Sequence, residues 1–261
     1  MTTNKTTVAE KEERTPELQP QEAVLKIRDE FLVEPEDEKV QPAPPQKKKF
    51  AEGLCFDKLV WIFVIGCIIG FIVETLWCYA RWGKIESRKG LIYGPFTPIY
   101  GFGGVLLTLA LYKVRKKNGF FVFVFSAIIG AAFEFVCSWI QEIAFGTISW
   151  DYSGSKLNLA GRINLQYAIF WGLLGMIFIQ HTYPFLSKYI ERTPVRLGKW
   201  LTWIFVVFMT LDMLISAVAV RRWTDRQLGE PPANVIEQTL DEWYPDKMME
   251  SIYPNMMLVK E

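Results

Sequence analysis

The sequence predicts an all-α fold: a polytopic membrane helix bundle of about five transmembrane helices, built on two tandem helical hairpins plus one extra helix. Three observations support this prediction. Hydrophobic residues make up 51% and aromatic residues 15% of the 261-residue chain, although both ends are polar. Five long apolar stretches recur between those ends. Four of these stretches share a spacing of small residues that relates them as two pairs.

The first element, residues 1–50, is a polar N-terminal arm that we expect to be disordered. It holds nine basic and eleven acidic side chains and six prolines. Apolar residues are too sparse there to offset the conformational entropy that is lost when a chain becomes ordered.

The predicted transmembrane bundle covers residues 55–222. Its apolar stretches are residues 59–80, 91–112, 120–145, 165–186 and 200–220. A helix of about 22 residues is roughly 33 Å long, which is enough to cross a hydrocarbon core of about 30 Å. Pro95 and Pro98 interrupt the start of the second stretch. We therefore expect that stretch to enter the membrane as a broken or re-entrant segment and to become regular only after Pro98.

The charges in the connecting loops predict the orientation. Twelve basic residues lie on the side that holds the N-terminus and nine on the other side. This difference favours a cytoplasmic N-terminus. We therefore expect a multi-pass protein of the cell membrane in this orientation. Five spans then place the C-terminus on the opposite side. The net charge of +1 gives no reason to expect a nucleic acid as partner, because phosphate binding needs a surplus of basic residues.

Residues 223–261 form an acidic C-terminal tail with eight acidic and three basic side chains. A short amphipathic helix is predicted at residues 234–243, with Val235, Ile236, Leu240 and Trp243 toward one face. Two possibilities stay open for this helix. It packs on the membrane domain or on a partner, or it belongs to a solvated tail.

The first and third predicted spans carry the same stripe of small residues and glutamate at a spacing of four. The matched positions, 60 residues apart, are Gly66, Gly70, Glu74 and Cys78 in one span and Ser126, Gly130, Glu134 and Ser138 in the other. The second and fourth spans match at an offset of 71, with Gly90, Gly101 and Gly104 corresponding to Gly161, Gly172 and Gly175. Small residues at helical spacing allow close approach of two helices. We therefore predict an internal repeat of two hairpins with the same orientation.

Acidic side chains inside the predicted spans are candidates for a functional site. Glu134 lies near the middle of the third span, and Glu74 lies about 9 Å from the end of the first. A central ionised carboxylate costs at least roughly 2.5–3.5 kcal/mol, so we expect arginines from the loops to pair with these residues. The predicted substrate-binding residues are Glu74, Arg88, Tyr93, Glu134, Glu142, Asp151, Asn158 and Arg162.

Two interpretations of these charges stay open at the level of sequence. They form a substrate or proton site between the hairpins, or a buried ion-pair network that fixes the register of the helices. Asp212, in the middle of the fifth span, is a further charge at membrane depth. An arginine from the hairpins is a possible partner for it.

Sequence motifs exclude several classes of enzyme. The chain has no Walker A, GxGxxG, HExxH or GxSxG pattern, so it carries no standard ATPase or hydrolase site. None of the four cysteines forms a CxxC pair, and we predict neither a disulfide framework nor a metal site. We expect no catalytic residue and no cofactor in this chain. Any ATP would act through a separate ATPase.

Several short motifs together resemble one family of membrane proteins. They are GFIVE at residues 70–74, RKGLIYGP at 88–95, PIYG at 98–101, Glu134 with Glu142, WDY at 150–152, Asn158, Gly161-Arg162 and YPN at 253–255. With these motifs the region from residue 65 to residue 255 resembles the ABC-transporter type IV family, the CmpB-like membrane proteins.

The resemblance implies a permease component of an ABC-type transporter that works with a separate ABC ATPase in the lipid bilayer. A chain of five spans also favours a homo-oligomer that would complete a transport pathway. Two other functions remain open: a membrane enzyme acting on a lipid-linked or phosphate-bearing substrate, and a non-transporting scaffold or sensor. In the enzyme, Glu134 or Glu142 would act as acid or base and Arg88 or Arg162 would bind phosphate.

Overall fold

The computed structural model describes residues 49–259. The predicted N-terminal arm, residues 1–50, therefore lies outside the described residues except for its last two. The helices are α2 (Phe56–Trp82), α3 (Pro98–Leu111), α4 (Gly119–Phe145), α5 (Leu165–Ile177), α6 (Tyr183–Ile190), α7 (Val195–Gln227), α8 (Val235–Trp243) and α9 (Asp246–Ile252). A π-helical turn, Phe178–Thr182, joins α5 to α6 without a break. Four two-residue strands lie in the loops and the tail: β1 (Thr147–Ile148), β2 (Asn158–Leu159), β3 (Ile163–Asn164) and β4 (Met257–Leu258).

The prediction of an all-α membrane bundle is confirmed. Four helical segments within the described residues are long and apolar enough to cross a bilayer: α2, α4, the continuous run Leu165–Ile190, and α7. The fifth apolar helix, α3, has 14 residues, which is roughly 21 Å at the helical rise and too short to cross alone. Non-helical backbone precedes α3 up to Thr97. The expected start of the regular helix at Pro98 is thus observed.

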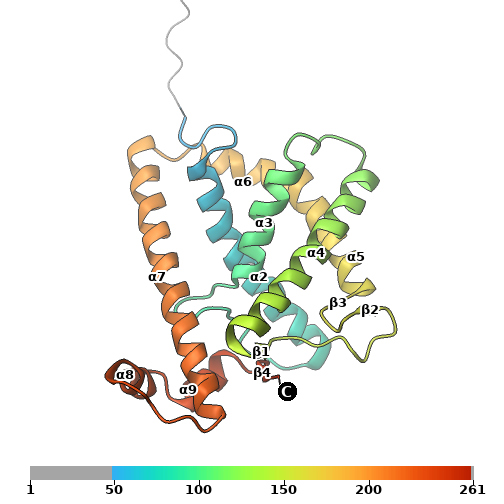
Figure 1. Cartoon of the computed structure of the whole chain (residues 1–261). Helices are drawn as coiled ribbons and strands as arrows, with labels where there is room; N and C mark the ends of the chain where they lie inside the picture. The colour runs from blue at the N-terminus through green and yellow to red at the C-terminus, as the bar shows by residue number, and fades with distance from the viewer. Residues whose placement is uncertain (1–48, 260–261) are drawn as a thin grey trace, which may run out of the picture. The chain divides into compact units, whose positions relative to one another are not determined.

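The bundle is organised as two hairpins followed by a single helix. Helix α3 packs along α2, and α5 packs along α4, while α7 contacts α2 (Figure 1). In each hairpin a glycine of the later helix allows close approach. A Cβ atom at Gly101 would overlap Cys67 of α2, and one at Gly172 would overlap Phe123 of α4. Small residues therefore set the distance between the helices of both pairs.

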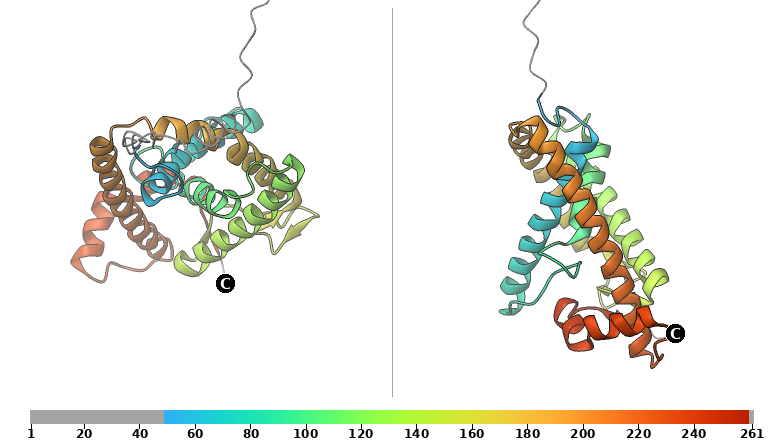
Figure 2. Two further views of the ribbon diagram at one scale, coloured as in Figure 1. Left: turned by 90° about the horizontal axis from the view of Figure 1, so that it is seen from above. Right: turned by 90° about the vertical axis from the view of Figure 1, so that its left-hand side faces the viewer.

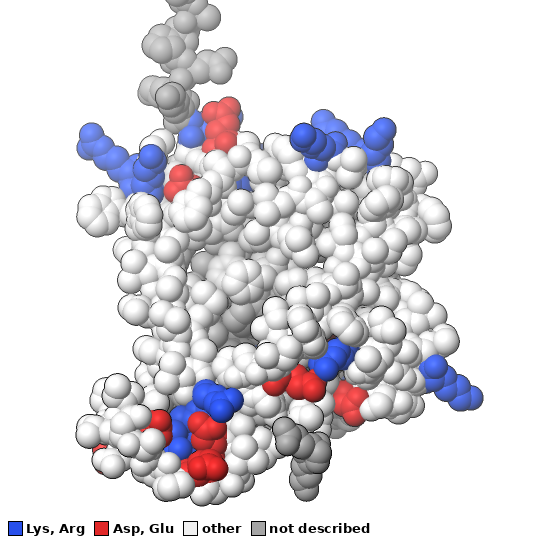
Figure 3. All heavy atoms as spheres, viewed as in Figure 1, with Lys and Arg blue, Asp and Glu red and all other residues white. Residues whose placement is uncertain are grey.

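On the face that Figure 3 shows, charged side chains gather at the two ends of the molecule. In the view of Figure 3 the basic and acidic groups form an upper and a lower zone, and a broad band without charges separates them. This band coincides with the apolar spans of the bundle. The distribution is that of a protein that crosses a membrane several times.

The tail begins later than the sequence predicted. Helix α7 continues to Gln227, beyond the expected boundary at residue 222. Helix α8 occupies almost the whole predicted range, and its N-cap Asn234 accepts a hydrogen bond from the backbone N–H of Glu237. Helices α8 and α9 lie across the lower end of α7 (Figure 2). Strand β4 pairs antiparallel with β1, which follows α4.

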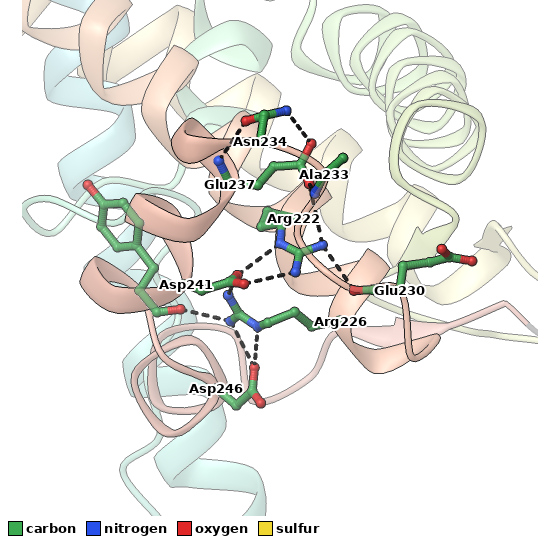
Figure 4. Close-up of polar contacts among 9 residues, drawn as sticks. Arg222, Arg226, Glu230, Ala233, Asn234, Glu237, Asp241 and Asp246 are labelled. Carbon is green, nitrogen blue, oxygen red and sulfur yellow. Dashed lines mark hydrogen bonds and ion pairs between the residues drawn. The ribbon is translucent and has the colours of Figure 1, made fainter.

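Ion pairs and apolar contacts hold the tail on the bundle. Arg222 of α7, which is 3% exposed, donates to both carboxylate oxygens of Asp241, with distances of 2.9 and 2.8 Å. Arg226 donates to the same carboxylate at 2.5 Å and to Asp246 at 2.9 Å (Figure 4). Trp223 packs in a buried cluster with residues of α9. Of the two possibilities for the tail helix, the structure therefore shows a helix that packs on the membrane domain.

Candidate functional site

The first hairpin holds Glu74 against an aromatic ring. Tyr100, in the first turn of α3, donates its hydroxyl proton to Glu74 over 2.5 Å. The ring of Tyr100 covers Gly70, one turn before the glutamate on α2, and leaves no room there for a Cβ atom. Glycine at this position thus allows the aromatic residue to reach the carboxylate.

The second hairpin holds Glu134 in the same way. Trp171 of α5 donates its indole N–H to Glu134 over 2.6 Å, and its ring covers Gly130 of α4 without space for a Cβ atom. The loop after α4 adds a second donor, the hydroxyl of Tyr152, at 3.0 Å. Burial raises the pKa of Tyr152 well above its usual range, so its hydroxyl keeps its proton and donates. Glu134 is 5% exposed and accepts hydrogen bonds from two neutral groups.

The two units correspond to each other in sequence and meet in space. Gly130 and Glu134 follow Gly70 and Glu74 by 60 residues, and Trp171 follows Tyr100 by 71. These are the offsets that relate the small residues of the spans. The rings of Tyr100 and Trp171 stack with their centroids 5.9 Å apart and an angle of 24° between their planes. A continuous polar and aromatic path therefore joins the carboxylates of the two hairpins.

In each hairpin an arginine from the connecting loop contacts the first helix, α2 or α4, one turn after the glutamate. In the second hairpin Arg162 donates to Ser138 at 3.2 Å and forms an ion pair with Glu142. In the first hairpin Arg88 donates to the sulfur of Cys78 at 3.1 Å. Arg162 and Glu142, both predicted site residues, thus form an ion pair with each other.

The expectation that arginines neutralise Glu74 and Glu134 is wrong. Within residues 49–259 neither carboxylate has a basic group at ion-pair distance. Their partners are phenol and indole groups of the facing helix and the following loop. A neutral donor satisfies an oxygen acceptor without bringing a second charge into the apolar region, where each charge has a high desolvation penalty.

Three other predicted site residues lie apart from the two glutamates. Asp151 accepts hydrogen bonds from the backbone N–H and the hydroxyl of Ser153, and these bonds lower the pKa of Asp151. Asn158 accepts from the backbone N–H of Gly161 at 2.9 Å. Both side chains therefore order the loop between α4 and α5. The hydroxyl of Tyr93 is hydrogen-bonded to that of Tyr244 in the tail at 2.9 Å.

Asp212 has a role that the sequence did not reveal. One of its carboxylate oxygens accepts hydrogen bonds from the backbone N–H of Tyr93 and the hydroxyl of Ser216, both at 3.2 Å. Ser216 in turn accepts from the backbone N–H of Ile92 at 2.9 Å. The suggested arginine partner is wrong for the described residues. Asp212 and Ser216 instead satisfy the non-helical backbone of the second span.

Sequence reasoning also missed Trp171 as a site residue. One signal could have found it, because Trp171 is the residue that corresponds to Tyr100 at the offset of 71. Tyr152 has no such counterpart, because the residues 60 and 71 positions before it are Ile92 and Arg81.

Two cavities on the bundle lie away from the glutamates. A cavity of about 380 Å³ is bordered by α5 and the loop before it, including Leu157 and Phe170. A second cavity, of about 680 Å³, lies at the end where α2 begins and is bordered by Tyr183 and Glu191. None of the eight predicted site residues lines either cavity. The candidate site is therefore defined by its polar contacts.

A comparison with protein families assigns the membrane bundle to a known family. The sequence model of a family described as "Putative ABC-transporter type IV" matches residues 61–217, which is more than half of the 261-residue chain. Searches of curated proteins and of solved structures gave no match. The matched region begins in α2 and ends in α7, and it includes both glutamates with their aromatic donors. The chain therefore belongs to the ABC-transporter type IV family.

Proposed function

We propose that this chain is the permease component of an ABC-type transporter and that Glu74 and Glu134 form its polar site between two repeated hairpins. The observation that carries this proposal is the stacking of Tyr100 on Trp171. This contact brings together two equivalent carboxylate units at the boundary between the hairpins. Internal repeats with a site at their interface are a common construction of membrane transporters.

The chemistry of this site fits the recognition of a cation or a proton. Glu74 is half-buried and has one hydrogen-bond donor, Tyr100. Glu134 is almost completely buried and has two. An ionised carboxylate has about four acceptor positions, so both groups keep acceptor capacity for a cationic group of a solute. Attraction between opposite charges is stronger at low dielectric than in water.

The other predicted residues have different places in this proposal. The ion pair of Glu142 and Arg162 continues the polar stripe of α4 toward the loop. Arg88 lies at the corresponding end of the first hairpin. Asp151 and Asn158 order the loop between α4 and α5, and the hydroxyl of Tyr93 contacts that of Tyr244 in the tail. Because the chain has no Walker A pattern, hydrolysis of ATP requires a separate ABC ATPase as partner.

The first test concerns this partner. The full-length chain, carrying an affinity tag, is purified from native membranes in a mild detergent, and the co-purified proteins are identified by mass spectrometry. We expect an ABC ATPase in stoichiometric amount. Its consistent absence, together with accumulation of a single lipid precursor in a deletion strain, would contradict the permease and favour the membrane enzyme.

The second test concerns the carboxylate. Glu134→Gln is compared with Glu242→Gln, which changes an exposed acidic residue of α8. We expect Glu134→Gln to leave the amount of purified complex close to wild type and to abolish stimulation of the ATPase by the transported solute. Should protein level and activity fall in parallel, Glu134 has a structural role instead. Glu242→Gln should change neither quantity.

A further inference from the structure

The two loop arginines differ in one respect: a carboxylate neutralises only one of them within the described residues. Arg162 forms an ion pair with Glu142, two turns after Glu134 on α4. The residue two turns after Glu74 on α2 is Trp82. The guanidinium of Arg88 lies 5.4 Å from the centre of the Trp82 ring. An indole thus occupies, in the first hairpin, the place that a carboxylate has in the second.

The charge of Arg88 is left without an acidic partner. Among residues 49–259 no carboxylate lies at ion-pair distance from it, and Glu86 of the same loop pairs with no basic group there. Its Nε atom has no hydrogen-bond acceptor among these residues. Arginine presents five N–H donors, and the only side-chain acceptor that the described residues provide is the sulfur of Cys78. Most of the hydrogen-bonding capacity of this guanidinium is therefore unused.

The position of Arg88 is fixed by its neighbours. Its carbonyl oxygen accepts a hydrogen bond from the hydroxyl of Thr97 at 2.7 Å. Ser87 donates its hydroxyl to the carbonyl of Ile252 in α9 at 3.0 Å, which ties the loop to the tail. Cys78, the acceptor of the guanidinium, is fully buried. The loop thus holds Arg88 in place before any ligand binds, which lowers the entropic cost of binding.

A second arginine lies beside the same indole. The guanidinium of Arg81 is also 5.4 Å from the centre of the Trp82 ring, and Arg81 is exposed. Trp82, the last residue of α2, is 54% exposed. Tryptophan at the end of a span prefers the level of the lipid headgroups. Two guanidinium groups therefore lie near one ring, at the end of a span, where this preference of tryptophan predicts the lipid headgroups.

From this arrangement we infer that Arg88 and Arg81, both next to Trp82, form a binding site for a phosphate group, and that an anionic lipid headgroup is the source that fits the position of Trp82 at the end of a span. Guanidinium groups bind phosphate through paired N–H donors. The bound anion supplies the negative charge that Glu142 provides to Arg162 in the other hairpin. This site is separate from the carboxylates of the proposed transport pathway.

The substitution that tests this inference most directly is Trp82→Glu, which places a carboxylate where the second hairpin has Glu142. An internal carboxylate would occupy Arg88 and compete with the lipid. Arg88→Gln removes the positive charge itself and is the alternative test variant if Trp82→Glu does not fold. Arg192→Gln is the matched control, because Arg192 also lies on an aromatic ring, at 5.2 Å from Tyr189, but at the other end of the bundle.

The measurement is native mass spectrometry of the full-length chain with short-chain phosphatidylglycerol, short-chain phosphatidylcholine or inorganic phosphate as probe. We expect wild type to retain one phosphatidylglycerol, and we expect Trp82→Glu and Arg88→Gln to bind it about tenfold more weakly, as the loss of a charge-assisted contact predicts. Arg192→Gln should bind like wild type. Displacement of the lipid by inorganic phosphate at equal concentration would assign the site to a soluble phosphate compound.

Three results would overturn the inference. The first is equal binding of phosphatidylcholine and phosphatidylglycerol by wild type. The second is unchanged phosphatidylglycerol binding in both Trp82→Glu and Arg88→Gln. The third is an equal loss in Arg192→Gln, which would indicate general attraction between a basic surface and an anionic lipid.

Discussion

The ring of Tyr100 stacks on the indole of Trp171, and each of these residues donates a hydrogen bond to a glutamate of its own hairpin. The contact is the structural link between Glu74 and Glu134. Two aromatic rings that pack directly against each other therefore connect the two carboxylates. Stacked aromatic pairs add about 0.5–1.5 kcal/mol beyond the area that they bury.

Removal of the indole donor should destabilise the protein. Trp171→Phe keeps a ring at the position but takes away one of the two hydrogen bonds to Glu134. A hydrogen bond to a charged group contributes roughly 1.5–3 kcal/mol, and we expect a loss of that size in thermal unfolding of the purified protein in detergent. Trp139→Phe, at an exposed position of α4, is the control and should unfold like wild type. Equal behaviour of the two variants would contradict the assigned contact.

Alanine should be poorly tolerated at the glycines under the two rings. A Cβ atom at Gly70 would overlap Tyr100, and one at Gly130 would overlap Trp171. Forcing extra volume into a packed site costs about 1–3 kcal/mol. Gly119→Ala is the matched control, because its Cβ atom would lie 3.5 Å from the sulfur of Met176, an ordinary contact. In thermal unfolding, Gly70→Ala and Gly130→Ala should each have a lower melting temperature than Gly119→Ala. If Gly119→Ala is equally destabilising, the close approach of the rings is not the cause.

Acid should release the tail from the end of α7. Hydrogen bonds from Arg222 and then Arg226 lower the pKa of Asp241 below its ordinary value of 3.8. The ion pairs therefore stabilise the docked tail fully above that value, and their contribution is lost as the pH falls through the lowered pKa. Hydrogen exchange of residues 235–252, corrected for the intrinsic effect of pH, should show this loss of protection.

Asp241→Asn should release the same segment at neutral pH. It leaves the buried guanidinium of Arg222 without its main partner, which costs roughly 3 kcal/mol when the site is buried. Glu242→Gln, one residue further along α8, alters a carboxylate with no ion pair among the described residues and should retain full protection. If Asp241→Asn remains as protected as Glu242→Gln, the apolar cluster around Trp223 is sufficient to hold the tail.

Alanine and asparagine should differ at Asp212. Asp212→Asn keeps a side-chain oxygen that can accept the hydrogen bonds from Tyr93 and Ser216. Asp212→Ala removes the acceptor and leaves the part-buried backbone N–H of Tyr93 without a partner, at a cost of about 1–3 kcal/mol. The melting temperature of Asp212→Ala should therefore lie below that of Asp212→Asn. The reverse order would show that the charge of Asp212, and not its acceptor oxygen, is the property that matters.

The span positions and the hairpins could be predicted because they depend on local features of the chain. Apolar length, helix breakers and the spacing of small residues are visible without knowledge of the fold. Pro98 begins α3, as its fixed backbone angle and missing N–H group require. Asn234 caps α8 for an equally local reason, since its side chain accepts a hydrogen bond from the first turn.

The partners of the carboxylates could not be predicted in the same way. Whether Glu134 faces an arginine or an indole depends on the rotation of α4 against α5, and hydropathy does not specify this rotation. The sequence argument also assumed that a charge at membrane depth needs an opposite charge. The structure instead gives Glu134 two neutral donors, Trp171 and Tyr152. The docking of α9 and the pairing of β1 with β4 likewise join segments far apart in the sequence.

The shortness of α3 has a consequence for biosynthesis. The backbone N–H groups of Ile92 and Tyr93 donate to Ser216 and Asp212. These two acceptors are synthesised more than a hundred residues after the donors. Until α7 is synthesised, these groups have no partner in an environment without water. The second crossing can thus be completed only together with the last one. Nascent chains that stop before α7 should remain with the insertion machinery and become substrates of membrane proteases.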